Sequence, residues 1–199
     1  ARLLRAQVHL LRVAVAAAHE SSALRDVERE LSSLQRQALA VVADVTRRAE
    51  IDRLVKNVVE SWGRIDILVN NAGILRPAPL ESITEKQWDE MMAVHLKGSF
   101  NCTQAVLPIM KRQRRGKIIN VAAPSALRGS FGVADYAAAK GGIIAFTRNA
   151  ANELKSYNIQ VNCISPVADT RMTEVLTAFR GQHLGESPGQ HRVVSPDAV

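Results

Sequence analysis

The sequence predicts an α/β fold, a three-layer doubly wound domain built on a mostly parallel sheet. Three observations support this prediction. Short, continuous apolar runs recur along the chain, stretches with helical periodicity alternate with them, and 47% of the residues are hydrophobic. Continuous apolar strands are typical of sheets covered on both faces, and strand–helix alternation is typical of parallel sheets. With 199 residues, the chain fits a single domain spanning residues 1–199.

Five runs rich in Val, Ile, Leu and Ala have the length and composition of buried strands. They are residues 13–17, 38–43, 65–70, 117–122 and 159–164. Helical periodicity is found in four stretches, which are residues 22–36, 47–62, 84–113 and 136–155. The second helix is expected to stop at Gly63, and the third to begin at Thr84 with Gln87 at capping-box spacing. A break in the third helix is expected near Gly98.

The charge of the chain does not make it a nucleic-acid binder. The formal net charge is +7, and much of the excess lies in a run that comprises Lys111, Arg112, Arg114, Arg115 and Lys117. No aromatic residue alternates with this run, whereas single-strand binding needs aromatic stacking platforms. We interpret the run as a solvated helix end and expect no nucleic-acid partner.

The cysteines and the hydropathy of the chain indicate the compartment of the protein and argue against a metal site and a membrane span. Cys102 and Cys163 are far apart in the sequence, with no paired-cysteine spacing or histidine cluster nearby. We expect two free thiols in a reducing compartment, hence a cytoplasmic protein, and no metal site. No apolar run approaches the roughly 18 residues of a membrane span, so no membrane association is expected.

Tyr136 and Lys140 are candidate chemical groups at the start of the last long helix. Their spacing of four places both side chains on one face of that helix. A tyrosine acts as a general acid toward a carbonyl when its phenolic pKa is lowered, and a nearby ammonium lowers it. Alone, the two residues also fit an ordinary exposed helix pair.

Other distinctive residues directly follow predicted strands. Asp44 follows the second strand, Asn70-Asn-Ala-Gly73 the third and Pro166 the fifth. Ligands of open parallel sheets bind outside the carboxyl ends of the strands. The small Ala72 and Gly73 permit close approach of the backbone to a ligand. We therefore expect a ligand cleft at this edge rather than an ordinary turn.

Together these stretches resemble the short-chain dehydrogenase/reductase family, most closely its 3-oxoacyl-acyl-carrier-protein reductase-like branch. The similarity covers nearly the whole chain and is specific for the family, though not for a substrate. The matching stretches are Asp44-Val-Thr46, Gly63-Arg-Ile-Asp-Ile-Leu-Val-Asn-Asn-Ala-Gly73, Gly116-Lys-Ile-Ile-Asn-Val121, Tyr136-Ala-Ala-Ala-Lys-Gly-Gly142 and Ile159-Gln-Val-Asn162. The resemblance implies a Rossmann-type fold and hydride transfer between NAD(P)H and a ketone, 3-oxoacyl group or secondary alcohol.

The resemblance also implies residue roles. Tyr136 is the proton donor or acceptor, and Lys140 holds the nicotinamide ribose and lowers the tyrosine pKa. Asp44 and Val45 contact the adenine. The residues expected to line the rest of the cofactor site are Asn70, Ala72, Gly73, Pro166 and Thr170.

The chain departs from the family pattern within the site. Ala123 stands in place of the catalytic serine, and losing such a donor typically costs about 10²–10³ in rate. Ser125 is the candidate substitute. His95 replaces an asparagine and is either a packed, satisfied histidine or a catalytic relay, since imidazole donates and accepts near neutral pH. Val167 follows Pro166 where the family has glycine.

The chain ends are expected to differ from the family as well. The family's first strand and Gly-rich phosphate loop have no counterpart, so the domain is expected to be incomplete at both ends and its dinucleotide affinity lower. Homo-oligomerisation, common in the family, is doubtful for a chain that ends at Val199. Ala18 and His19 stand where an acid would favour NAD, which gives a weak lean to NADP over NAD.

Two functions are compatible with these patterns. One is an NAD(P)-dependent short-chain oxidoreductase that acts on a small-molecule or acyl-carrier-linked carbonyl substrate. The other is a catalytically dead binding or scaffold protein with the same fold. The departures at Ala123, His95 and Val167 favour the second function, whereas the Tyr136/Lys140 pair favours the first. A measurement of turnover separates them.

Overall fold

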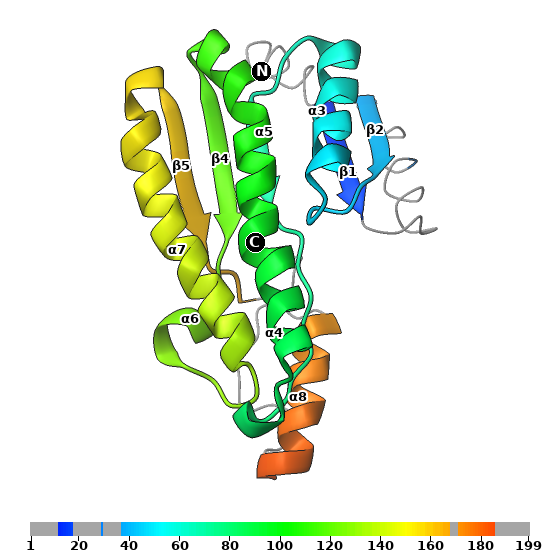
Figure 1. Cartoon of the computed structure of the whole chain (residues 1–199), viewed down its shortest axis with the longest axis vertical. Coiled ribbons are helices and arrows are strands. Elements are labelled where there is room, and N and C mark those ends of the chain that lie inside the picture. The colour runs from blue at the N-terminus through cyan, green and yellow to red at the C-terminus, as the bar shows by residue number, and fades with distance from the viewer. Residues whose placement is uncertain (1–11, 18–28, 30–36, 168–170, 186–199) are drawn as a thin grey trace, which may run out of the picture.

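The computed structural model of the chain describes residues 12–17, 29, 37–167 and 171–185 (Figure 1). The strands are β1 Arg12–Ala17, β2 Gln37–Val42, β3 Ile67–Asn70, β4 Gly116–Val121 and β5 Ile159–Ile164. The helices are α3 Arg48–Trp62, α4 Glu85–Met92, α5 Gly98–Gln113, α6 Ser125–Arg128, α7 Ala134–Leu154 and α8 Arg171–Leu184. The helix predicted at residues 22–36 lies outside the described residues, apart from Arg29.

All strand pairs among the described residues are parallel, as the sequence predicts. β1 pairs with β2, and β3, β4 and β5 form a three-stranded sheet in that order. Asn70 of β3 is in register with Asn120 of β4, and Asn120 with Cys163 of β5. The carboxyl ends of three strands therefore meet at one edge, where the candidate ligand residues follow.

β3 is shorter than predicted and begins at Ile67 rather than at Ile65. The backbone of Ile65 bonds to the Gln113 carboxamide instead of a neighbouring strand: its N–H donates to Gln113 Oε1 at 3.0 Å, and its carbonyl accepts from Nε2 at 2.7 Å. A side chain 48 residues away thus satisfies the groups that a ladder would otherwise use.

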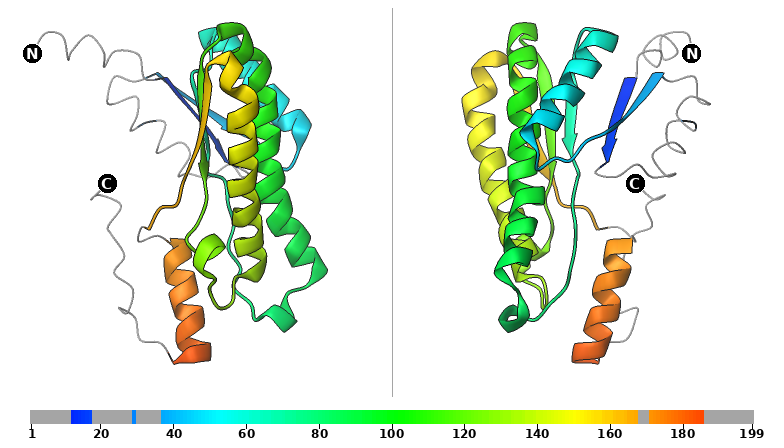
Figure 2. Two further views of the ribbon diagram at one scale, coloured as in Figure 1. Left: turned by 90° about the vertical axis from the view of Figure 1, so that its left-hand side faces the viewer. Right: turned by 45° about the vertical axis from the view of Figure 1, so that its right-hand side comes forward.

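α5 and α7 cover one face of the three-stranded sheet (Figure 2). Side chains on the opposite face remain open to solvent among the described residues: Ile67, Val69 and Ile164 are 52%, 54% and 50% exposed. In the described residues, the three-stranded sheet thus has one of the two helical layers of the predicted α/β fold.

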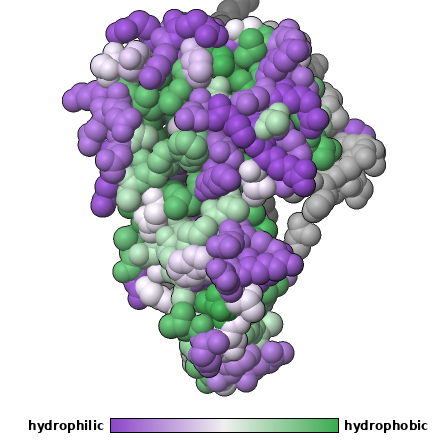
Figure 3. Space-filling view, in the orientation of Figure 1, coloured by the Kyte–Doolittle hydropathy of each residue, from purple (hydrophilic) through white to green (hydrophobic). Residues whose placement is uncertain are grey.

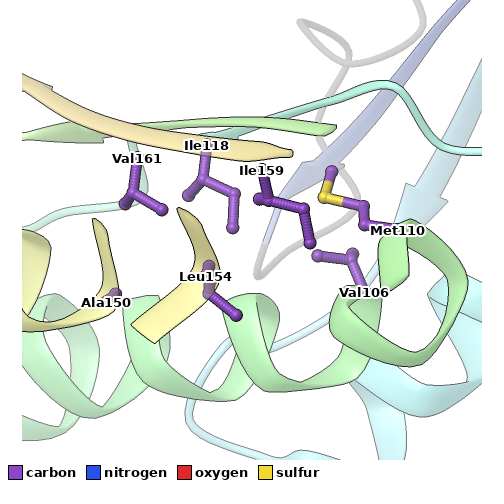
Figure 4. Packing of buried hydrophobic residues seen from close by; sticks show 7 residues of the cluster. All are labelled: Val106, Met110, Ile118, Ala150, Leu154, Ile159 and Val161. Carbon is purple, nitrogen blue, oxygen red and sulfur yellow. The ribbon is translucent and has the colours of Figure 1, made fainter. Parts of the chain in front are cut away.

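The main core lies between this sheet and its two helices (Figure 4). It is formed by apolar side chains of two strands and two helices, namely Val106, Met110, Ile118, Ala150, Leu154, Ile159 and Val161. A second cluster of Ala43, Ile51 and Ala105 attaches the β2–α3 unit to α5. Burial of this apolar surface is the main stabilising term and fixes α7, which carries the candidate site, on the sheet.

The helix ends follow the sequence signals in part. Gly63 ends α3 with φ of 73°, a left-handed conformation that glycine adopts without strain. The Thr84 hydroxyl caps α4 by accepting from the Gln87 N–H at 3.1 Å. The Gln87 side chain does not complete the capping box; instead, its Nε2 donates to the Arg76 carbonyl and to Asp135 Oδ2. Only the Thr84 half of the predicted box is formed.

No break occurs at Gly98, because a π-helical segment, Ala93–Lys97, joins α4 to α5. π-Helical turns inside helices are frequent at functional sites, and this one carries His95. Gly98 instead serves close packing, since a Cβ there would lie 2.7 Å from Val45 Cγ2.

Candidate active site

Three side chains identified from the sequence meet at the carboxyl edge of the sheet. Tyr136 and Lys140 project from the first turns of α7, and His95 projects from the π-helical segment. The His95 and Tyr136 rings are in edge-to-face contact with centroids 5.1 Å apart. Lys140 Nζ lies 5.5 Å from the Tyr136 ring centroid. The fold therefore brings together residues far apart in sequence.

The Lys140 ammonium is held at the end of β4. Lys140 is only 3% exposed, and its Nζ donates to the Val121 carbonyl at 2.6 Å. Burial lowers the pKa of Lys140 to about 8 because it disfavours the charged form. The side chain remains mostly protonated at neutral pH. A buried lysine with a lowered pKa is typical of functional sites.

Tyr136 is half-buried at the start of α7. Burial raises the pKa of its phenol above the usual 10, so Tyr136 keeps its proton at neutral pH. The lowering by Lys140 that the family resemblance implies is therefore not found. The reason is desolvation of the phenol, while the Lys140 ammonium is directed to the Val121 carbonyl.

His95 is packed but not fully satisfied. It is 1% exposed, and burial, with a smaller contribution from the Lys140 charge, lowers its pKa to about 4, so the ring is neutral at pH 7. Its Nε2 lies 2.8 Å from the Ile74 carbonyl oxygen and 3.1 Å from the Ile74 nitrogen. The shorter distance favours the tautomer in which Nε2–H donates to the carbonyl. Nδ1 is then a bare acceptor, buried without a partner.

Gly73 lies directly against the His95 ring. A Cβ added at Gly73 would be 2.5 Å from His95 Cε1 and 3.2 Å from Nδ1. The sequence suggests that this glycine admits a ligand, but in the structure its close neighbour is the imidazole of the chain itself. The loop after β3 is thus held by His95 at two consecutive residues, Gly73 and Ile74.

A buried polar network lies beneath the site and connects β3, β4, α5 and α7. Asn70 Nδ2 donates to Asn120 Oδ1 at 2.8 Å and to Thr103 Oγ1 at 3.1 Å. Asn120 Nδ2 donates to Thr147 Oγ1 at 2.8 Å, and that hydroxyl donates to the Ile143 carbonyl at 2.7 Å. The Asn70 side chain is therefore engaged inside the protein. Sequence reasoning missed Asn120 and Thr147, although a polar residue within an apolar strand was a signal for Asn120.

Asp44 and Val45 form the turn after β2. Asp44 Oδ1 accepts from the N–H and hydroxyl of Thr46, both at 2.8 Å, and the Asp44 N–H donates to Glu50 at 2.8 Å. The Val45 carbonyl accepts from Asn101 Nδ2 of α5 at 2.9 Å. The turn is thereby fixed against the helix that follows the His95 segment.

The remaining candidates occupy strand exits or lie outside the description. Ala72 and Pro166 are exposed after β3 and β5. Ala123 is 6% exposed after β4, and Ser125 begins α6 with its Oγ buried and unpartnered. Thr170 lies outside the described residues.

α8 is fastened to the loop that precedes α7 by a cluster of rings. Phe131 of that loop stacks on Phe179 with centroids 5.8 Å apart, and Phe179 lies 4.2 Å from His183. Arg180 also donates to the Ser130 hydroxyl. Sequence reasoning missed α8, although Met172, Val175, Leu176 and Phe179 recur at helical spacing.

Three further features of the described residues concern metal ligands, membrane-spanning helices and a surface groove. In this part of the chain, no three His, Cys, Asp or Glu side chains are grouped as metal ligands. No helix found there combines the length and apolar character needed to cross a membrane. The face seen in Figure 3 carries an apolar groove of about 610 Å³, lined mainly by Met92, Leu96, Phe100 and Phe146.

The described residues form parallel strands with helices packed against them, and α7 carries a tyrosine and a lysine four residues apart. The profile of the short chain dehydrogenase family matches residues 5–181, and the chain belongs to this family.

Curated relatives agree with this assignment. The chain is 44% identical over 154 residues to the 3-oxoacyl-[acyl-carrier-protein] reductase FabG of Thermotoga maritima, covering 77% of this chain and 63% of that protein. It is 39% identical over 169 residues to a 3-oxoacyl-[acyl-carrier-protein] reductase of Synechocystis sp., covering 84% and 68%. The peroxisomal hydratase-dehydrogenase-epimerase of Neurospora crassa is 42% identical over 125 residues, covering 63% of this chain but 14% of that protein. The match thus spans less than two thirds of the first of these relatives.

Proposed function

We propose that this chain carries the catalytic end of an NAD(P)H-dependent short-chain oxidoreductase. The reaction is reversible hydride transfer between the cofactor and a ketone, 3-oxoacyl group or secondary alcohol. The observation that supports this best is the Tyr136/Lys140 pair, a phenol beside a buried ammonium whose pKa is lowered to about 8. We further propose that residues 1–199 form one domain, part of the family's fold.

The described residues fit the nicotinamide end of such a cofactor. His95 Nδ1 and Ser125 Oγ are buried without partners, and unpartnered buried polar atoms call for a ligand or water. Lys140 donates to the Val121 carbonyl, and its ammonium has three N–H donors in all. We propose that Lys140 holds the nicotinamide ribose and that Asp44 and Val45 contact the adenine. The residues proposed to line the cleft are Asn70, Ala72, Gly73, Pro166 and Thr170.

When bound, the nicotinamide supplies the hydride for reduction or accepts it in oxidation. In reduction the Tyr136 hydroxyl gives its proton to the carbonyl oxygen while the carbonyl carbon gains the hydride, which yields the alcohol. The raised pKa keeps Tyr136 in the protonated form that this step requires. The Lys140 ammonium stabilises the phenolate that remains. In oxidation Tyr136 takes the proton back.

The finer assignments extend this proposal. The substrate is a small-molecule or acyl-carrier-linked carbonyl compound, which the names of two relatives support. NADP is preferred to NAD, because no acidic residue stands at Ala18 or His19, where an acid would favour NAD. The free thiols of Cys102 and Cys163 support a cytoplasmic location.

The second candidate function is a scaffold that has lost catalysis. Two observations favour it. Ala123 offers no hydroxyl at the place of the family's serine, and the His95 ring fills the space against Gly73. If the chain is such a scaffold, it should fold as stably as an active enzyme of this fold but should show no turnover.

The test restores the missing hydroxyl. The chain, Ala123→Ser and the matched control Ala122→Ser are assayed with a 3-oxoacyl thioester by loss of NADPH absorbance. We expect Ala123→Ser to raise the rate about 10²–10³-fold and Ala122→Ser, at a neighbour that is also buried, to leave it unchanged. Absence of turnover in all three proteins would support the scaffold function instead.

A further inference from the structure

Two side chains of α7 reach consecutive residues of β4. Lys140 donates to the Val121 carbonyl, and Thr147 accepts from the Asn120 side chain. Residues seven apart in a helix lie on the same face, two turns along the axis. The position of α7 along β4 is therefore tied at two points, one inside the site and one behind it.

Both ties are buried. Lys140 is 3%, Thr147 4% and Asn120 0% exposed. Apolar contacts, such as that of Ile143 in the same helix face, tolerate small displacements. A buried hydrogen bond is directional, and breaking it leaves polar groups without water. The Thr147–Asn120 contact, which lies outside the site itself, thus resists sliding or rotation of the helix together with the Lys140–Val121 bond.

Thr103 offers an internal comparison within the same network. Its hydroxyl accepts from Asn70 at 3.1 Å, and the residue is 3% exposed. Thr103 belongs to α5, however, and no catalytic candidate of α7 depends on it directly. Thr103 and Thr147 are both buried and both accept from an asparagine side chain, but Thr103 belongs to α5 and Thr147 to α7.

We propose that Thr147, acting through Asn120, is a positioning residue that sets where Tyr136 and Lys140 stand at the end of β4. The proposal rests on the function proposed above for these two residues. The Thr147 hydroxyl fixes α7 against Asn120, and the helix then presents the Lys140 ammonium to the adjacent Val121 carbonyl.

The experiment is an NMR titration of the Lys140 side chain in the full chain labelled with ¹³C-lysine. The Lys140 signal is assigned by its loss in Lys140→Arg. Thr147→Val and Thr103→Val each remove one buried hydroxyl of the network, while Thr147→Ser keeps it. The neighbouring titratable groups are His95, which is neutral above its pKa of about 4, and Tyr136.

We expect Thr147→Val to raise the Lys140 pKa from about 8 by about one unit, because a displaced helix admits water to the ammonium. Thr147→Ser and Thr103→Val are expected to leave it near 8. An unchanged Lys140 pKa in folded Thr147→Val would overturn the proposal. Equal shifts in Thr147→Val and Thr103→Val would also overturn it, because they indicate general loosening.

Turnover of the chain gives a second readout. Misplacement of Lys140 is expected to lower kcat about tenfold in Thr147→Val with little change in KM, and to spare Thr103→Val. Equal losses of kcat in both variants would contradict a positioning role. A chain without any turnover would remove the proposed function, but the titration would still decide whether Thr147 positions Lys140.

Discussion

Replacing Gly73 by alanine perturbs the contact that closes the site around His95. The added Cβ would lie 2.5 Å from His95 Cε1 and 3.2 Å from Nδ1. The imidazole cannot easily move away, because it is 1% exposed, abuts Tyr136 and is bonded to Ile74 through Nε2. Either the ring or the loop after β3 must shift.

Overpacking of a filled interior costs about 1–3 kcal/mol. The neighbour here is a rigid ring rather than the end of a flexible chain, so we expect Gly73→Ala to lower the unfolding free energy by about 2–3 kcal/mol. Gly141→Ala in α7 is the matched control. Nothing lies within 4 Å of a Cβ at Gly141, and alanine is favoured over glycine in a helix by about 1 kcal/mol. The same chemical change should therefore have opposite signs at the two positions.

Urea unfolding followed by circular dichroism measures both variants, and a double-mutant cycle with His95→Ala locates the clash. Once the ring is removed, most of the Gly73→Ala penalty should disappear, with a coupling energy of about 1–3 kcal/mol. If Gly73→Ala costs the same with and without the His95 ring, the reasoning is refuted, because the strain then arises elsewhere in the loop.

Three further predictions concern His95, the buried network and α8. The free energy of unfolding should fall by about 3 kcal/mol as the pH drops from about 6.5 to about 4, because His95 takes up a proton in the unfolded state and not in the folded state. The urea midpoint measured against pH should show this fall, and His95→Gln should remove it. Asn120→Ala should cost about 2–4 kcal/mol, because it removes two buried hydrogen bonds, to Asn70 and to Thr147. Asn162→Ala, at an exposed position of β5, should cost under about 0.5 kcal/mol in the same assay. Phe179→Ala should speed tryptic cleavage within α8 severalfold; an equal effect of Phe100→Ala, which is 43% exposed on α5, would contradict a specific role of the ring cluster.

The alternation of parallel strands and helices could be predicted because it depends on local patterns. Apolar runs of strand length and stripes at helical spacing are visible without any tertiary information. The shared helix face of Tyr136 and Lys140 could be predicted in the same way, since residues four apart in a helix lie on one face. The late start of β3 could not be predicted, because the backbone groups of Ile65 bond to the side chain of Gln113, which is distant in the sequence.

The electrostatics of the site depend on burial and long-range contacts. The direction of the Tyr136 pKa shift follows from desolvation, which no local pattern reveals. The unpartnered Nδ1 of His95 depends on the π-helical segment and on Ile74, 21 residues away. These features required the three-dimensional structure.

The most direct test of a nicotinamide site around Lys140 is a titration of the chain with NADPH, followed by nicotinamide fluorescence. Lys140→Ala is compared with Lys86→Ala, whose side chain is 87% exposed on α4. We predict saturable binding that weakens at least about tenfold in Lys140→Ala, a loss of about 1.4 kcal/mol, and is unchanged in Lys86→Ala. Equal binding by all three proteins, or no saturable binding by any of them, would contradict the proposed site.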